Sequence, residues 1–174
     1  MRGKFALTLL FIGISVFLNA YAPHFITDPA LSPDGTTVCF SYHGDLWLVP
    51  FTGGTASRLT STSASEFGPC WSPDGKSIAF TSNREGSSYV YVIPSSGGTA
   101  RPVYKSRMTV CDWFKDGKFL LCSKNNLNWG TSLYKVPLDG SAPVLISEIG
   151  DYFSCHTKDN NSIIFNRYGD AYRP

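Results

Sequence analysis

This 174-residue sequence has no large excess of charge of either sign. Its 15 basic residues exceed its 13 acidic residues by two, and Arg2 and Lys4 near the N-terminus account for that excess. Beyond them, 13 basic residues balance 13 acidic residues. Proteins that hold nucleic acid or an anionic membrane by charge carry a clear basic excess, so the sequence favours neither partner.

Long apolar runs, heptad repeats and low-complexity tracts are missing after residue 22. A membrane-spanning helix needs about 20 predominantly apolar residues in a row. A coiled coil needs apolar residues at a sustained heptad spacing. This part of the chain therefore predicts no membrane span, no coiled coil and no other helix.

Motifs that mark common active sites are also absent. The chain holds no Gly-x-Ser-x-Gly elbow, phosphate-binding loop, His-Glu-x-x-His helix or EF-hand calcium loop. Its three histidines, His24, His43 and His156, fall in three different repeats of the chain. The sequence therefore predicts no catalytic residue, no cofactor-binding residue and no metal ligand.

Cysteine is scarce and odd in number. The five cysteines are Cys39, Cys70, Cys111, Cys122 and Cys155. They cannot all pair within one chain, and no pair has the spacing of a zinc ribbon. Equivalent positions of other repeats carry apolar residues, so buried free thiols are the favoured interpretation. A disulfide stays open as the alternative for an exported protein.

The N-terminal segment, residues 1–22, has the three parts of a secretory signal peptide. A basic start at Met1–Lys4 precedes an apolar run from Phe5 to Leu18, and Ala20–Ala22 has a small-x-small cleavage pattern. The run is shorter than a bilayer span, and an uncleaved anchor is the alternative. The sequence thus predicts a periplasmic or secreted protein.

What the sequence does contain is a repeated unit of turn, strand, loop, strand and turn, which residues 70–98 display most clearly. In Ser72–Gly75, proline sets the first corner, aspartate can bond its own backbone, and glycine accepts a positive φ. Residues 77–82 alternate, and Tyr89–Ile93 is a β-branched and aromatic run that stops at Pro94. We expect the turn aspartate to cap backbone N–H groups rather than to act in catalysis.

This unit occurs four times. The turn aspartate recurs at intervals of 40, 42 and 43 residues, as Asp34, Asp74, Asp116 and Asp159. A period of about 40–45 residues with four short strands is typical of a β-propeller blade. The sequence predicts an all-β fold, an incomplete β-propeller of about three and a half four-stranded antiparallel blades over residues 23–174. The blades are expected at about 24–60, 61–104, 105–146 and 147–174, the last one incomplete.

Several side chains have predicted places within the blades. Trp113 stands where Trp71 stands in the preceding repeat, which fits an aromatic wedge between neighbouring blades. Tyrosine and tryptophan of the third strands are expected in the core, with a peptide-binding rim as the alternative. Asn125–Asn126 and Asn128 are expected in a loop, and Asn160–Ser162 matches a glycosylation acceptor.

Three and a half blades would leave two blade faces and several strand edges without neighbours. Propellers close with typically four to eight blades. We therefore expect the chain to be a piece of a longer protein. Completion of the ring by self-association is the alternative.

The repeats resemble those of known propellers. The string from Trp71 to Arg84 is similar to the WD40-like repeats of TolB-type proteins. A closer resemblance is to the N-terminal propeller of tricorn-like serine peptidases. It rests on Gly44–Pro50, on Gly53–Thr60 and on the end of the last repeat, with Asn166–Arg167 and Tyr172–Pro174. This second resemblance covers essentially all of the chain after the N-terminal segment.

The resemblance implies a role without catalysis. In tricorn-like peptidases, a six-bladed propeller precedes a second propeller, a small helical domain, a PDZ domain and the catalytic core. The nucleophile and its partners lie in those later parts, so no catalytic residue is carried over to this chain. The implied role is to admit or sort peptide or protein substrates for a downstream core on the same chain, which could be oligomeric at full length.

Two other functions fit the repeats. One is a TolB-like periplasmic propeller that binds a protein partner and has no enzymatic activity. The other is the propeller of an exported prolyl-oligopeptidase-type peptidase. Only a few residues separate Ala22 from the first blade, which counts against the TolB-like alternative because that type usually has a small α/β domain there.

Overall fold

The computed structural model describes residues 25–126, 130–149, 152–157, 159 and 162–167. These residues form fourteen β-strands and no helix. None of them belongs to a helix long and apolar enough to cross a bilayer. The predicted signal segment 1–22, His24, Asn128 and the end of the last repeat lie outside the described residues.

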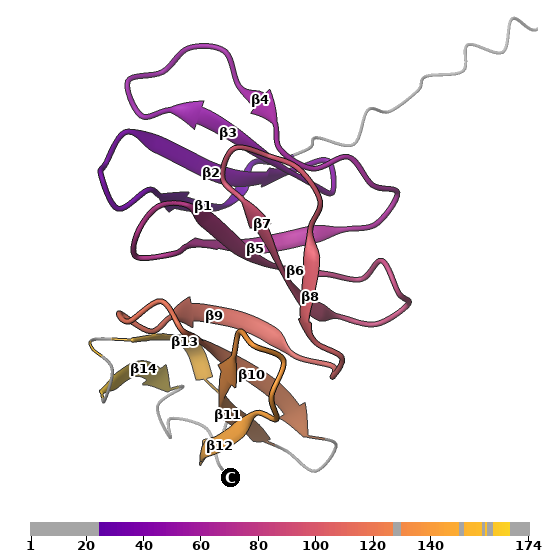
Figure 1. The fold of residues 1–174 in the computed structure, drawn as a ribbon, viewed down its shortest axis with the longest axis vertical. Helices are drawn as coiled ribbons and strands as arrows, with labels where there is room; N and C mark the ends of the chain where they lie inside the picture. The colour runs from indigo at the N-terminus through magenta and orange to yellow at the C-terminus, as the bar shows by residue number, and fades with distance from the viewer. Residues whose placement is uncertain (1–24, 127–129, 150–151, 158, 160–161, 168–174) are drawn as a thin grey trace, which may run out of the picture.

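The strands form three four-stranded antiparallel sheets and one strand pair, in chain order (Figure 1). The first sheet contains β1 (Thr27–Leu31), β2 (Thr37–Tyr42), β3 (Asp45–Pro50) and β4 (Ser57–Arg58). The second contains β5 (Glu66–Trp71), β6 (Ser77–Ser82), β7 (Tyr89–Pro94) and β8 (Arg101–Tyr104). The third contains β9 (Thr109–Trp113), β10 (Phe119–Asn126), β11 (Gly130–Pro137) and β12 (Val144–Ile149). The pair contains β13 (Tyr152–Thr157) and β14 (Ile163–Arg167).

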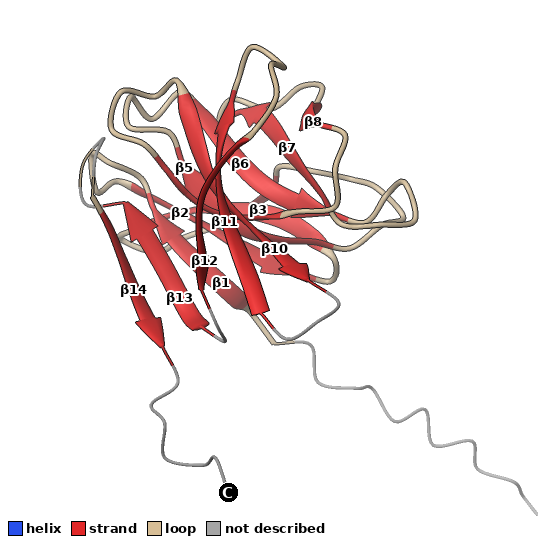
Figure 2. Ribbon diagram, turned by 90° about the horizontal axis from the view of Figure 1, so that it is seen from below, coloured by secondary structure: helices blue, strands red, loops and turns tan. Residues whose placement is uncertain are grey.

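The predicted fold class, an incomplete propeller of four-stranded antiparallel blades, is confirmed. The first strand of each sheet contacts the first strand of the next, so β1, β5, β9 and β13 follow one another along the inner side (Figure 1). Figure 2 shows that the described elements are all strands, joined by loops. The later strands of each sheet step outward from that line in order. Strand β12 ends at Ile149, beyond the blade boundary predicted at residue 146.

The loop predicted at Asn125–Asn126 is wrong, because both residues belong to β10. Asn125 pairs with Thr131, and Asn126 pairs with Gly130 across the hairpin. The Thr131 hydroxyl donates a hydrogen bond of 3.2 Å to Asn125 Oδ1. Asparagine is unfavourable in strands on average, but a cross-strand side-chain bond offsets that preference here.

The second sheet buries both of its faces because its side chains alternate. On β6, Ile78 and Phe80 pack toward the first sheet, whereas Ala79 packs toward the third. On β7, Tyr91 packs with the first set and Val92 with the second. Successive strand residues point to opposite faces, so each strand supplies two inter-blade cores at once.

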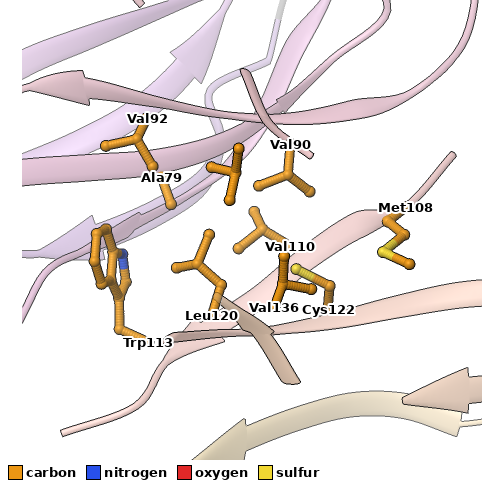
Figure 3. Close-up of a cluster of buried hydrophobic side chains, with 10 residues drawn as sticks. Ala79, Val90, Val92, Met108, Val110, Trp113, Leu120, Cys122 and Val136 are labelled. Atoms are coloured by element: carbon orange, nitrogen blue, oxygen red, sulfur yellow. The ribbon is translucent and has the colours of Figure 1, made fainter. Parts of the chain in front are cut away.

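The core between the second and third sheets is the largest of the three buried clusters in the described part of the chain. Figure 3 shows side chains of β6 and β7 on one side and of β9 to β11 on the other, directed toward one another. Its buried members are Ala79, Val90, Val92, Val103, Met108, Val110, Trp113, Leu120, Cys122 and Val136. At about 25 cal/mol per Å² of apolar surface removed from water, such a cluster is the main stabilising contribution between two blades.

Two tryptophans bridge neighbouring sheets, as predicted. The Trp71 indole N–H donates to the Ala30 carbonyl at 3.0 Å, and the Trp113 indole N–H donates to the Cys70 carbonyl at 3.0 Å. Each carbonyl belongs to the first strand of the preceding sheet. Trp113 is buried and Trp71 partly buried, so the ring fills the inter-sheet core while its only donor is satisfied.

The first strand of each of the first two sheets contains a bulge. Asp28 (φ +52°) and Gly68 (φ +61°) adopt left-handed backbone conformations, and the pairing of β1 with β2 and of β5 with β6 shifts there. The Gly68 N–H donates to Asp28 Oδ2 at 3.4 Å, which links the two bulges across the sheets. A bulge bends its strand and raises the local twist, which suits the crowded inner side of a propeller.

The four described cysteine thiols, Cys39, Cys70, Cys111 and Cys122, form no disulfide. Cys39 and Cys122 are buried in the two inter-sheet clusters. Burial disfavours the thiolate, and it raises the pKa of Cys39 to about 12 and the pKa of Cys122 well above its ordinary value. Both thiols therefore act as small apolar core groups. The side chain of Cys155 lies outside the described residues.

Substitution of Trp113 by phenylalanine tests the bridge between the second and third sheets. Trp113→Phe removes the N–H that the Cys70 carbonyl accepts and leaves a small void. We expect the free energy of unfolding of the full chain, measured by urea denaturation, to fall by about 1–3 kcal/mol. Phe51→Leu, at an exposed position, should change it by less than about 0.5 kcal/mol. Equal stability of the two variants would show that the hydrogen bond from Trp113 to the Cys70 carbonyl does not stabilise the fold.

Alkylation tests the state of the core thiols. Because thiolates are the reactive form, Cys39 and Cys122 should stay unlabelled by iodoacetamide at pH 8 in the native chain and become labelled in urea. Peptide mass mapping after brief exposure measures both conditions in one sample series. Comparable labelling of Cys122 with and without urea would mean that the thiol is not in the core.

Candidate functional site

The turn aspartates act as backbone caps, as predicted. Asp34, Asp74 and Asp116 each accept, through Oδ1, the backbone N–H of the residue two positions later, at 3.0, 3.1 and 2.9 Å. Asp159 accepts the N–H of Ser162 at 2.6 Å. The carboxylates are therefore engaged by their own turns, and their regular spacing follows from the repeat.

A serine precedes two of these aspartates and strengthens the turn. Ser32 and Ser72 donate hydroxyl hydrogen bonds to Asp34 and Asp74, at 2.6 and 2.7 Å. These bonds are the largest cause of the lowered pKa of both carboxyl groups, because they stabilise the charged form. Phe114 stands in place of the serine in the third turn.

Grooves separate successive turns on this face, which we call the turn face. A groove of about 610 Å³ lies between the first two turns and another of about 410 Å³ between the second and third. The bridging tryptophans Trp71 and Trp113 line one groove each. Both grooves therefore repeat the same blade-to-blade geometry.

A larger cavity of about 750 Å³ lies at the opposite end of the first two sheets, and we call it the strand-end cavity. The β2–β3 turn at His43–Gly44 and the connection between β4 and β5 form its walls. The Glu66 N–H donates to the Gly44 carbonyl at 2.8 Å, which holds the start of β5 against that turn. The cavity is thus shared between two blades.

Two ion pairs stand at this end of the sheets. Arg58 pairs with the buried Asp45, and Arg84 pairs with the fully buried Glu66. Thr62 connects the pairs, because its N–H donates to Asp45 Oδ1 at 3.2 Å and its hydroxyl to Glu66 Oε1 at 3.0 Å. Buried carboxylates need such partners, since an unpaired buried charge is strongly unfavourable.

Arg84 is held on its other side by aromatic rings. Its guanidinium lies 4.3 Å from the Tyr91 ring centre and 5.6 Å from that of Phe80. The Tyr91 hydroxyl donates to Glu85 Oε1 at 2.8 Å, and burial followed by this bond raises the pKa of Tyr91 to about 12. The stacked and paired arginine fixes the position of Glu66 at the end of the blade interface.

The two described histidines lie in different sheets. His43 lies in the β2–β3 turn, whereas His156 lies on β13 with Nδ1 3.8 Å from Asp112 Oδ2. Within the described part of the chain, no group of three or more histidine, cysteine, aspartate or glutamate side chains could hold a metal ion. The strand-end cavity was not anticipated from the sequence, because the ion pairs beside it join residues 13 and 18 positions apart, from β4 to β3 and from the β6–β7 turn to β5.

Removal of the Ser72 hydroxyl tests the cause of the lowered Asp74 pKa. In Ser72→Ala we expect the Asp74 pKa to rise toward its ordinary value of 3.8, while Asp34 in the same molecule keeps its low pKa. A lowered folded pKa stabilises the fold above the unfolded pKa, and that contribution disappears as the pH falls through the folded pKa. The variant should therefore lose less stability on acidification than the parent. Side-chain carboxyl NMR titration measures both groups, and an unchanged Asp74 pKa would contradict the assignment.

Comparison with known proteins places this geometry in a family. The sequence profile described as "Tricorn protease N-terminal beta propeller domain" matches residues 23–174. The chain is 35% identical over 127 residues to Tricorn protease homolog 1 of Streptomyces coelicolor, and the match covers 68% of this chain and 11% of that protein. The chain thus spans about a tenth of that relative's length.

Solved structures agree in fold. A putative TolB from Agrobacterium tumefaciens matches with a TM-score of 0.69 and 23% identity, over 78% of this chain and 50% of that chain. The tricorn protease matches with a TM-score of 0.59 and 21% identity, over 72% of this chain and 13% of that chain. These structures show the fold, whereas the profile match over residues 23–174 shows the family. The chain belongs to the family of tricorn protease N-terminal β-propeller domains.

Proposed function

We propose that this chain is the non-catalytic N-terminal propeller of an exported tricorn-like serine peptidase, where it helps to admit or sort peptide substrates for a catalytic core elsewhere on the same protein. The observation that carries the proposal is family membership over residues 23–174 together with a cavity at the end of the inner strands. At about 750 Å³, this cavity is within the range of ligand pockets.

Further domains of the same chain are the proposed partners. The relative in Streptomyces coelicolor is far longer than the region matched here. Large apolar side chains are exposed on the first sheet, among them Phe25, Leu31 and Phe51, and at the other end, among them Val144 and Ile164. Exposed apolar faces of this kind mark contact surfaces, and additional blades would cover them.

The proposed location is outside the cytoplasm. Residues 1–22 combine a basic start, a short apolar run and a small-x-small pattern, as secretory signals do. The thiols of Cys39 and Cys122 are compatible with an oxidising compartment. Both are buried, so neither is open to an oxidant in solution.

Substitution at the rim of the strand-end cavity tests the sorting role. Ser63 is exposed at that rim, and Ser63→Trp would narrow the opening without touching the ion pairs. In the full-length protein, we expect KM for a decapeptide to rise several-fold while cleavage of a dipeptide amide is unchanged. Ser96→Trp, at an exposed position of the turn face, is the matched control.

Two results would overturn the proposal. Equal kcat/KM of the Ser63→Trp variant and the parent on the decapeptide would remove the sorting role, and stable capture of a protein partner without peptide cleavage would favour the TolB-like alternative. Cleavage by the 174-residue chain alone that a serine-directed inhibitor blocks would refute its non-catalytic assignment.

A further inference from the structure

Aromatic rings from separate parts of the chain meet at the strand-end cavity. Tyr42 ends β2, and His43 follows it in the β2–β3 turn of the first sheet. Phe67 comes from β5 of the second sheet, and Phe25 comes from the residues just before β1. The cavity of about 750 Å³ therefore has an aromatic wall that neither blade forms alone.

The ring of Tyr42 is held in place by its neighbours. Its centre lies 4.3 Å from the centre of the His43 ring and 6.1 Å from that of Trp47, both in edge-to-face contact. Aromatic rings favour this arrangement. The Trp47 indole N–H also donates to the Tyr42 carbonyl at 3.2 Å, which fixes the backbone at the same point. A ligand that packs on Tyr42 meets a ring that is already ordered, so binding loses little side-chain freedom.

The ring of Phe25 stands at the opening of the cavity. It lines the cavity and is nevertheless 74% exposed, and the next residue, Ile26, is 63% exposed. Neighbouring exposed apolar side chains beside a cavity are typical of a surface that a ligand or a partner covers. An occupant that packed on the Phe25 ring would remove apolar surface from water, which favours binding.

The charged side chains of the wall are paired within the protein. Asp45 pairs with Arg58, and Glu66 pairs with Arg84. The side chains of Asp45 and Glu66 are 5% and 0% exposed, so their carboxylates are closed to an occupant of the cavity. A charged ligand would lose water without gaining a partner, unless it broke one of these pairs. The cavity therefore favours an uncharged group.

The hydrogen-bonding groups between the two ion pairs are engaged with one another as well. Thr62 donates its N–H to Asp45 Oδ1 and its hydroxyl to Glu66 Oε1. A carbohydrate would need partners for many hydroxyl groups, because each polar group that is buried without a hydrogen bond is unfavourable. An aromatic side chain has at most one such group, and it suits a wall whose free surface is made of rings.

We propose that the strand-end cavity binds an aromatic side chain of a peptide substrate, with Phe25, Tyr42 and Phe67 packed around its ring. The proposal rests on the peptide-sorting function proposed above and states which peptides the propeller selects. A cavity of about 750 Å³ is within the range of ligand pockets, and it leaves room for the backbone on either side of the bound ring.

The first experiment follows backbone amide shifts of the full 174-residue chain by NMR during titration with capped pentapeptides. Their central residue is phenylalanine, leucine, lysine or glutamate, with alanine on either side. The phenylalanine peptide should shift the amide of Gly44, in the cavity wall, and leave that of Gly75, in a turn-face groove, unchanged. Leucine should bind about 3- to 10-fold more weakly, because it lacks ring contacts. Lysine and glutamate should bind more than about 10-fold more weakly, because their charges would lose water.

Variants of the wall test which rings take part. Phe25→Ala should weaken binding of the phenylalanine peptide by about 3- to 10-fold, and the fold should tolerate it because the side chain is exposed. Phe67→Leu, which keeps an apolar side chain on β5, should weaken binding by about 2-fold or more. Phe51→Ala is the matched control, since Phe51 is 63% exposed and does not line the cavity. Parental affinity in Phe25→Ala or in Phe67→Leu, or an equal loss in Phe51→Ala, would overturn the proposal.

Other occupants of the cavity would give different results. A Gly44 shift on dilution of the chain without peptide would mean that a second copy fills the cavity. A shift with maltose as large as that with the phenylalanine peptide would indicate a carbohydrate site. Either result would overturn the proposal.

A comparison with the full-length protein separates this proposal from the general function. Equal binding of all four pentapeptides overturns aromatic selection but leaves peptide sorting intact. Selective binding by the 174-residue chain, together with an equal KM of the full-length protein for decapeptides with and without phenylalanine, supports the site and contradicts the sorting function.

Discussion

The sheets described here depend on burying their faces against neighbouring sheets, and the second sheet does so on both sides. A single four-stranded sheet has no second layer to cover it. Its apolar side chains are removed from water only where the sheet packs against the neighbouring blade. The alternation of Ile78 and Phe80 with Ala79 along β6 serves two such interfaces at once. The bridges from Trp71 and Trp113 to the preceding inner strand add a directed contact to each interface. Stability is therefore a property of neighbouring pairs, as in other repeat architectures.

At one end of the first blade interface, the buried groups are charged, and ion pairs take the place of apolar packing. Where the apolar core stops, Asp45 and Glu66 are buried and Arg58 and Arg84 pair with them. Such pairs add little net stability when both charges must lose water, but breaking one leaves an uncompensated charge. Their effect is to fix the position of carboxylate oxygens beside a cavity.

Family membership and geometry complement each other. The profile match and the relative in Streptomyces coelicolor identify the kind of protein, although the chain covers only 11% of that relative. The described residues supply backbone caps, tryptophan bridges and a cavity. Substrate handling, with cleavage in other parts of the same protein, is the function that we propose from this combination.

The sequence by itself determined the fold class, because turn chemistry, strand alternation and a period of about 40–45 residues are all local or regular signals. It also determined that Asp34, Asp74 and Asp116 are caps and that Trp113 repeats the role of Trp71. The length of the β10–β11 hairpin was not determined in this way: Asn125 lies in a strand because it pairs with Thr131 across that hairpin. The strand-end cavity likewise arose only on folding. Its wall combines the β2–β3 turn with the connection between β4 and β5 because two sheets pack face to face, and no local pattern in the chain encodes which side chains will be opposite one another across a blade interface.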